Sequence, residues 1–171
     1  MEKSPDTVSG YIAALEHGDL EKRRAATRHL ADIGEAALPA LIKLMQETES
    51  NDVRWYCARA LSLMGRPAAG PLLSAMKSDN NPAFRKYAAA CLGAMGEKAI
   101  DPLIEAMKDA DPGLRGFLAL ALCRIGTPAI EPLKKAMDDA DPTFAECASL
   151  TLWKMGEEGV QAMADMVRKE D

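Results

Sequence analysis

Few side chains in this sequence could act as nucleophiles, proton carriers or metal ligands. The only histidines are His17 and His29. Four cysteines occur without a CxxC pair or any other metal-binding spacing: Cys57, Cys91, Cys123 and Cys147. A cysteine without a basic neighbour behaves as a small apolar residue rather than as a nucleophile. The sequence therefore predicts no catalytic centre, no bound metal and no cofactor, and it predicts reduced thiols, as in a cytoplasmic protein.

Aromatic and arginine side chains are the other residues whose types and spacing could do chemistry. Three aromatics recur at intervals of 30 or 31 residues, with Trp55 beside the first of them: Tyr56, Tyr87 and Phe117. Four arginines recur at the same intervals: Arg23, Arg54, Arg85 and Arg115. Aromatic residues flanked by arginine often anchor protein interfaces, and a guanidinium pairs well with carboxylates. This spacing indicates a surface that binds another molecule, provided that one repeated structural element positions these side chains.

A repeat of 30 or 31 residues supplies that element. Five glycines, each directly after Ile or Met, mark the repeat: Gly34, Gly65, Gly96, Gly126 and Gly156. Leucine stands four residues before every one of these glycines, and methionine stands eleven residues after four of them. Internal repetition of this length is typical of a solenoid.

Each repeat is predicted to form two helices, because 30 Ala and 19 Leu outnumber 4 Val and 7 Ile. Counting back from the glycine, apolar residues at slots −12, −8, −5, −4 and −1 share one helix face. Asp or Asn should cap the start of this helix, and the glycine should end it in a left-handed conformation. A proline near the start of the following helix should bend that helix.

The whole chain, residues 1–171, is expected to form one domain of five helix pairs and a capping helix, about eleven helices. The expected bounds are 5–34, 35–65, 66–96, 97–126 and 127–156 for the repeats, and 157–169 for the capping helix.

Slots −10, −9, −6 and −2 lie outside the apolar face and vary between repeats. Their basic, aromatic and leucine side chains are predicted to line one groove: Arg24, Arg28, Trp55, Tyr56, Arg59, Lys86, Tyr87, Phe117, Leu120, Arg124, Leu150 and Lys154. Trp153 at slot −3 stands where the other repeats have small residues. We expect it to cap the end of the core, with a dimer contact as the alternative.

Three segments of the fourth repeat and its neighbour, DPGLR (111–115), ALCRIG (121–126) and AIEPLKKAM (129–137), resemble HEAT repeats. The resemblance is strongest to the HEAT-like subclass named from phycobilin lyases, and it covers residues 5–169. It implies an all-α, right-handed α-α superhelix whose concave face is lined by the helices that precede the glycines. A related protein, deoxyhypusine hydroxylase, binds two irons through His-Glu pairs at slots −10 and −9. No repeat of this chain has such a pair, so a di-iron site is excluded.

The resemblance also implies a second use for the arginines at slot −11. In HEAT repeats, an Asp at the turn and an Arg four residues later bond across neighbouring repeats. The expected structural ladder consists of Asp19, Arg23, Arg54, Arg85, Asp111, Arg115 and Asp141. The alternative is that the arginines together bind an anion.

Charge and hydropathy limit the function classes. The net charge of −5 and the pI near 5.2 argue against nucleic-acid binding. No apolar run is long enough to span a membrane, and the first residues have no secretory core. We therefore expect a cytoplasmic, non-catalytic scaffold or adaptor, monomeric alone, that binds a peptide or helix of another protein. The resemblance implies two alternatives: a chromophore (bilin) lyase or chaperone-type subunit, and a nucleic-acid-binding HEAT-like protein.

Overall fold

The computed structural model describes residues 7–168, and over this range it contains eleven α-helices, three short 3₁₀ turns and no strand. The predicted all-helical fold and its helix count are confirmed. The chain divides into two compact units, residues 1–91 and 92–171. Residue 5, where the first repeat is expected to begin, and residue 169, where the capping helix is expected to end, lie outside the described residues. The assignment of all repeats to one domain stays a prediction.

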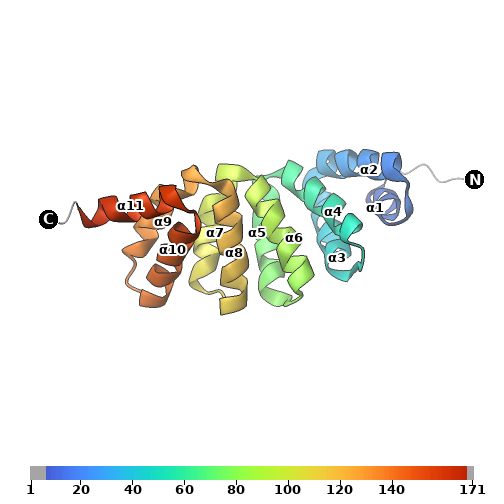
Figure 1. Cartoon of the computed structure of the whole chain (residues 1–171). Coiled ribbons are helices and arrows are strands. Elements are labelled where there is room, and N and C mark those ends of the chain that lie inside the picture. The colour runs from blue at the N-terminus through green and yellow to red at the C-terminus, as the bar shows by residue number, and fades with distance from the viewer. Residues whose placement is uncertain (1–6, 169–171) are drawn as a thin grey trace, which may run out of the picture. The chain divides into compact units, whose positions relative to one another are not determined.

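Unit 1 consists of consecutive helices joined by short turns (Figure 1). Its elements are α1 (Val8–His17), α2 (Leu20–Ile33), the 3₁₀ turn Gly34–Ala37, α3 (Leu38–Glu47), α4 (Asn51–Met64), α5 (Arg66–Ser78) and most of α6 (Pro82–Ala94). α1 packs against α2 and α3 against α4, and the second helix of each pair also packs against its counterpart, α2 against α4.

Unit 2 repeats this arrangement. Its elements are the end of α6, the 3₁₀ turn Gly96–Ala99, α7 (Ile100–Lys108), α8 (Pro112–Ile125), the 3₁₀ turn Thr127–Ala129, α9 (Ile130–Met137), α10 (Pro142–Lys154) and α11 (Glu157–Val167). α7 packs against α8, α9 against α10, and α8 against α10, while α11 lies on α9 and α10. We call α2, α4, α6, α8 and α10 the second helices.

The predicted Asp or Asn cap is present at the start of four second helices, and Ser50 takes this place at the start of α4. The carboxylates of Asp19 and Asp111 accept hydrogen bonds of 2.9 Å from the backbone N–H of the third residue after them. The five repeat glycines all have positive φ, between +67° and +80°. At Gly65 and Gly126 the ψ values are −135° and −145°, so the backbone lies outside the αL region that was expected. This combination of angles is essentially restricted to glycine.

The predicted apolar slots form the core. The five leucines at slot −4 have no exposed surface: Leu30, Leu61, Leu92, Leu122 and Leu152. Phe84 and Phe144 at slot −12 are fully buried as well, whereas Lys22, which occupies this slot in the first repeat, is exposed. The core face of each second helix is therefore fixed, and the remaining slots are left for the surface.

The proline after each repeat glycine acts differently from the prediction. In three repeats the segment from glycine to proline is not one bent helix. It begins with a 3₁₀ turn, and Pro39, Pro102 or Pro132 then stands within the first three residues of a separate α-helix. Proline costs nothing there, because the first N–H groups of a helix have no partner within it. Within residues 7–168, Pro71 alone lies beyond the first turn of a helix, α5.

Candidate functional site

Five of the predicted groove residues of unit 1 gather around a hollow between α2 and α4. It has a volume of about 530 Å³. Its lining residues are Glu21, Arg24, Thr27 and Arg28 of α2 and Trp55, Tyr56, Arg59 and Leu63 of α4. We call it the aromatic hollow. The helical period brings residues three and four apart to one face, which explains why each helix contributes one continuous stripe.

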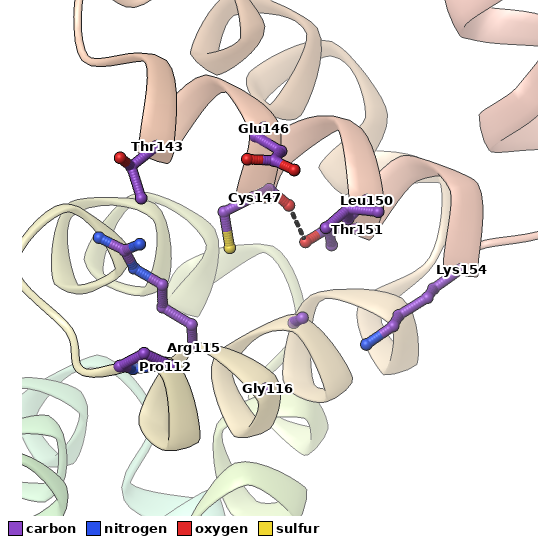
Figure 2. A pocket seen from close by; sticks show the side chains of 10 residues that line it. Pro112, Arg115, Gly116, Thr143, Glu146, Cys147, Leu150, Thr151 and Lys154 are labelled. Atoms are coloured by element: carbon purple, nitrogen blue, oxygen red, sulfur yellow. Dashed lines mark hydrogen bonds between the residues drawn. The ribbon is translucent and has the colours of Figure 1, made fainter.

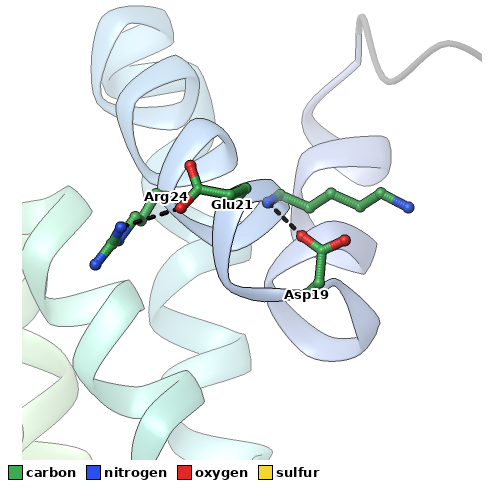
Figure 3. A network of polar contacts seen from close by, with 4 residues as sticks. Asp19, Glu21 and Arg24 are labelled. Atoms are coloured by element: carbon green, nitrogen blue, oxygen red, sulfur yellow. Dashed lines mark hydrogen bonds and ion pairs between the residues drawn. The ribbon is translucent and has the colours of Figure 1, made fainter.

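The aromatic hollow combines exposed rings with cations. The Trp55 and Tyr56 rings meet edge to face, with centroids 5.0 Å apart, and Trp55 is 53% exposed. Arg24 forms an ion pair of 3.0 Å with Glu21 (Figure 3). Within residues 7–168, the side chains of Arg28 and Arg59 form no ion pair and donate no hydrogen bond. The hollow is therefore basic, with two guanidinium groups available to a ligand.

A second hollow lies in unit 2 between α8 and α10. It has a volume of about 300 Å³ (Figure 2). Its lining residues are Pro112, Arg115, Gly116 and Ala119 of α8 and Thr143, Glu146, Cys147, Leu150, Thr151 and Lys154 of α10. We call it the glycine hollow. Leu150 and Lys154 were predicted groove residues, whereas Arg115 was predicted only as a ladder residue.

The thiol of Cys147 points into the glycine hollow, but it is not set up as a nucleophile. Burial raises its pKa above the ordinary value, and this outweighs Arg115 and Lys154, which act in the opposite direction. Burial also raises the pKa of Cys57 and of Cys91 to about 12. A thiol with a raised pKa stays protonated near neutral pH and reacts slowly.

The other predicted groove residues lie on α6 and α8 and line neither hollow. Tyr87 and Phe117 are half-buried, and Leu120 is 57% exposed. The side chain of Arg124 lies directly over Gly93, where an added Cβ would come within 2.7 Å of it. Because Tyr56 and Phe117 belong to different units, the single groove through all these residues stays a prediction.

The arginines at slot −11 bind the turn that precedes their own helix. Arg23 donates to the carbonyl of Glu16, and Arg115 donates from Nε to Met107 and from Nη2 to Lys108, all at 3.1 Å. Arg85 likewise donates from Nε to two carbonyls, at 2.9 and 3.1 Å. These carbonyls lie at the end of the preceding helix, where they lack partners within that helix. The Asp–Arg pairing between repeats stays a prediction.

Arg54 is more buried than Arg23 and Arg115, but its hydrogen bonds are longer. Its Nη1 donates over 3.4 Å to Glu49 and over 3.3 Å to Asn51, and its Nε has no partner within residues 7–168.

Trp153 does not cap the core as expected, since it is 64% exposed. The reason is the direction of slot −3. In unit 2 this slot faces the next second helix, as Gly93 faces Arg124 and the Cys123 thiol approaches the carbonyl of Thr151 at 3.8 Å. A residue at this slot in α10 therefore points sideways along the row of helices and not into the core.

The described residues give no sign of a metal site. His29 stacks on Tyr11, with ring centroids 4.8 Å apart, and His17 is exposed at the end of α1. Within residues 7–168, no group of three His, Cys, Asp or Glu side chains could hold a metal ion. No helix in this range is long and apolar enough to cross a membrane.

Comparisons with known proteins identify the repeat. A family model described as HEAT repeats matches residues 8–79, 70–153 and 100–171, which together span nearly the whole chain. One similar solved structure is the complex of CpcE and CpcF of phycocyanin lyase from Nostoc sp. PCC7120. It shares 22% sequence identity over 84% of this chain and 96% of the other, with a TM-score of 0.43. No curated protein matches the chain.

Proposed function

Since the chain belongs to the HEAT-repeat family, we propose that it is a non-catalytic scaffold that binds a segment of another protein on the surface of its second helices. The fold supplies packed helix pairs within each unit, and the function depends on the side chains at the variable slots. The aromatic hollow of unit 1 is the principal binding site in this proposal.

The single observation that carries the proposal is the chemistry of that hollow. Arg28 and Arg59 line the hollow together with the exposed ring of Trp55, and within residues 7–168 neither pairs with a carboxylate. Tryptophan, tyrosine and arginine are the residues that most often dominate interface energetics. A volume of about 530 Å³ lies within the range of pockets that hold a small ligand or a few side chains.

The chemistry of the hollow defines its partner. A guanidinium forms paired hydrogen bonds with a carboxylate, and an indole face favours contact with an aromatic or apolar side chain. The proposed ligand is therefore an acidic-aromatic peptide, extended or helical, whose carboxylates pair with Arg28 and Arg59. Lys86 and Tyr87 of α6, which were predicted as groove residues, are proposed to add further contacts to the same partner.

Selection from a library of random peptides displayed on phage, with the full chain as bait, tests the proposal. We expect the enriched peptides to combine acidic and aromatic residues. Fluorescence anisotropy of a labelled synthetic copy should then show about tenfold or weaker binding to the Trp55→Ala and Arg59→Gln variants. Trp153→Ala and Arg66→Gln are the matched controls, because both residues are exposed and line neither hollow.

The proposal is wrong if no peptide is enriched, or if all four variants bind equally well. Tight binding of single-stranded DNA, with a steep dependence on salt, would replace it with nucleic-acid recognition. Visible absorbance that co-purifies with the chain and is lost in Trp55→Ala would favour the bilin-lyase alternative instead.

A further inference from the structure

The glycine hollow of unit 2 owes its shape to a missing side chain. Gly116 lies in the interior of α8, and a Cβ added there would meet no atom within 4 Å. The same slot, −10, holds large side chains on the other second helices: Arg24, Trp55, Lys86 and Glu146. Glycine weakens a helix interior relative to alanine. Neither a tight contact nor a positive φ requires glycine here, so its effect is to keep the hollow open.

One end of the hollow has a fixed cation. Two carbonyls, of Met107 and Lys108, hold the Nε and Nη2 of Arg115 at 3.1 Å each. Its Nη1 has no hydrogen-bond partner in the part of the chain that the structure describes. An arginine held in this way loses little side-chain freedom when it binds a ligand.

The other end has a second cation. Lys154 is exposed and forms no ion pair within residues 7–168. Figure 2 shows the Cys147 thiol between Arg115 and Lys154. Both cations favour the charged form of that thiol, which indicates a positive potential inside the hollow, while Glu146 opposes them. Ala119 and Leu150 supply apolar surface between the two ends.

We propose that the glycine hollow binds one carboxylate, presented by an acidic side chain of the partner segment, with the carbon chain on Leu150 and Gly116, the oxygens at the Nη1 of Arg115, and Lys154 adding to the positive potential from the other end. About 300 Å³ is the lower end of the range for ligand pockets, which suits one side chain better than a larger molecule. The inference rests on the proposed function for the identity of the partner, but the site is separate from the aromatic hollow.

Two small probes test the site without the unidentified partner. The ¹⁵N-labelled full chain is titrated at constant ionic strength with N-acetyl-glutamate N′-methylamide and with the corresponding glutamine compound. We expect saturable shifts of the Gly116, Ala119 and Cys147 amides with the glutamate probe. The dissociation constant should be about 1–10 mM, as for other fragments of this size. The glutamine probe should bind about tenfold more weakly.

Matched variants separate the site from general effects. Gly116→Leu fills the hollow and should abolish the saturable shifts, whereas Gly70→Leu, at a more exposed position in α5 of unit 1, should leave them unchanged. Lys154→Gln should weaken the glutamate probe, and Lys135→Gln, on α9, should not. Gly116→Ala should raise the melting temperature by about 1–4 °C while it weakens the probe, which a purely structural glycine would not do.

Three results would overturn the inference: equal binding of the two probes, unchanged binding to Gly116→Leu, or a free dicarboxylate such as glutarate binding about tenfold more tightly than the blocked glutamate. The last result would assign the site to a small metabolite instead of a protein side chain. If only the aromatic hollow fails its own test, the Gly116 and Cys147 shifts persist, so the two failures are distinguishable.

Discussion

Alanine at Gly65 and alanine at Gly116 should change the stability of the fold in opposite directions. At both positions an added Cβ would meet no atom within 4 Å outside the neighbouring residues of the chain, and neither glycine precedes a proline. Gly65 has φ +69° and ψ −135°, and this backbone conformation costs an L-residue about 1–3 kcal/mol. Gly116 lies within α8, where alanine gains about 0.5–1 kcal/mol over glycine. The two variants should therefore differ by about 1.5–4 kcal/mol.

Urea unfolding of the full chain, followed by circular dichroism, measures this difference through linear extrapolation. Gly65→Ala should move the unfolding midpoint to lower urea, and Gly116→Ala should move it to higher urea. If both midpoints move in the same direction, or if Gly65→Ala unfolds like the unmodified chain, the positive φ does not explain why glycine occupies the repeat boundary.

Asp19→Ala should lower the free energy of unfolding by about 0.5–2 kcal/mol, because the Lys22 N–H loses its 2.9 Å acceptor at the start of α2 (Figure 3). Asp32→Ala, near the other end of α2, is the control and should not lower the thermal unfolding temperature. An equal loss of stability in both variants would mean that the removed charge, and not the removed cap, is responsible. The free energy of unfolding should also fall as the pH rises from 9 toward 12. Burial, with a smaller effect of Glu16, raises the pKa of Cys57 from 9.0 to about 12. The folded state therefore keeps this thiol neutral over a pH range in which the unfolded state loses the proton. Cys57→Ala should show a smaller fall over this range and an unchanged pH dependence below it; an identical profile would assign the fall to other groups.

The helices could be predicted because each relies on residues with one dominant physical role. A repeated glycine indicates positive φ, an Asp before Pro indicates a helix start, and a leucine column indicates the buried face. All three predictions agree with Gly126, Asp111 and Leu122 in the structure. The effect of Pro102 was harder to predict, because proline suits both a bent helix and the first turn of a new one.

The candidate site could be predicted only in part. Trp55 and Tyr56, at slots −10 and −9, line the aromatic hollow, but the extent of each hollow depends on how two neighbouring helices pack. The glycine hollow was missed because the prediction looked for large or charged side chains, whereas Gly116 contributes space. A small residue in a column of large ones was the available signal.

The prediction for Trp153 was wrong because it assumed that a large residue at the last slot −3, with no further helix pair beside it, would cover the end of the core. Helix periodicity fixes the direction of a slot, and the size of the residue does not change it.

The chain has two tryptophans, and they lie in different units. Since Trp55 and Trp153 are both more than half exposed, the intrinsic emission of each indole responds to water and to quenchers at its own place in the chain. A single Trp→Phe change therefore leaves a reporter in one unit alone. Unfolding of either unit, or binding of a ligand to its hollow, can then be followed by tryptophan fluorescence without attaching a dye.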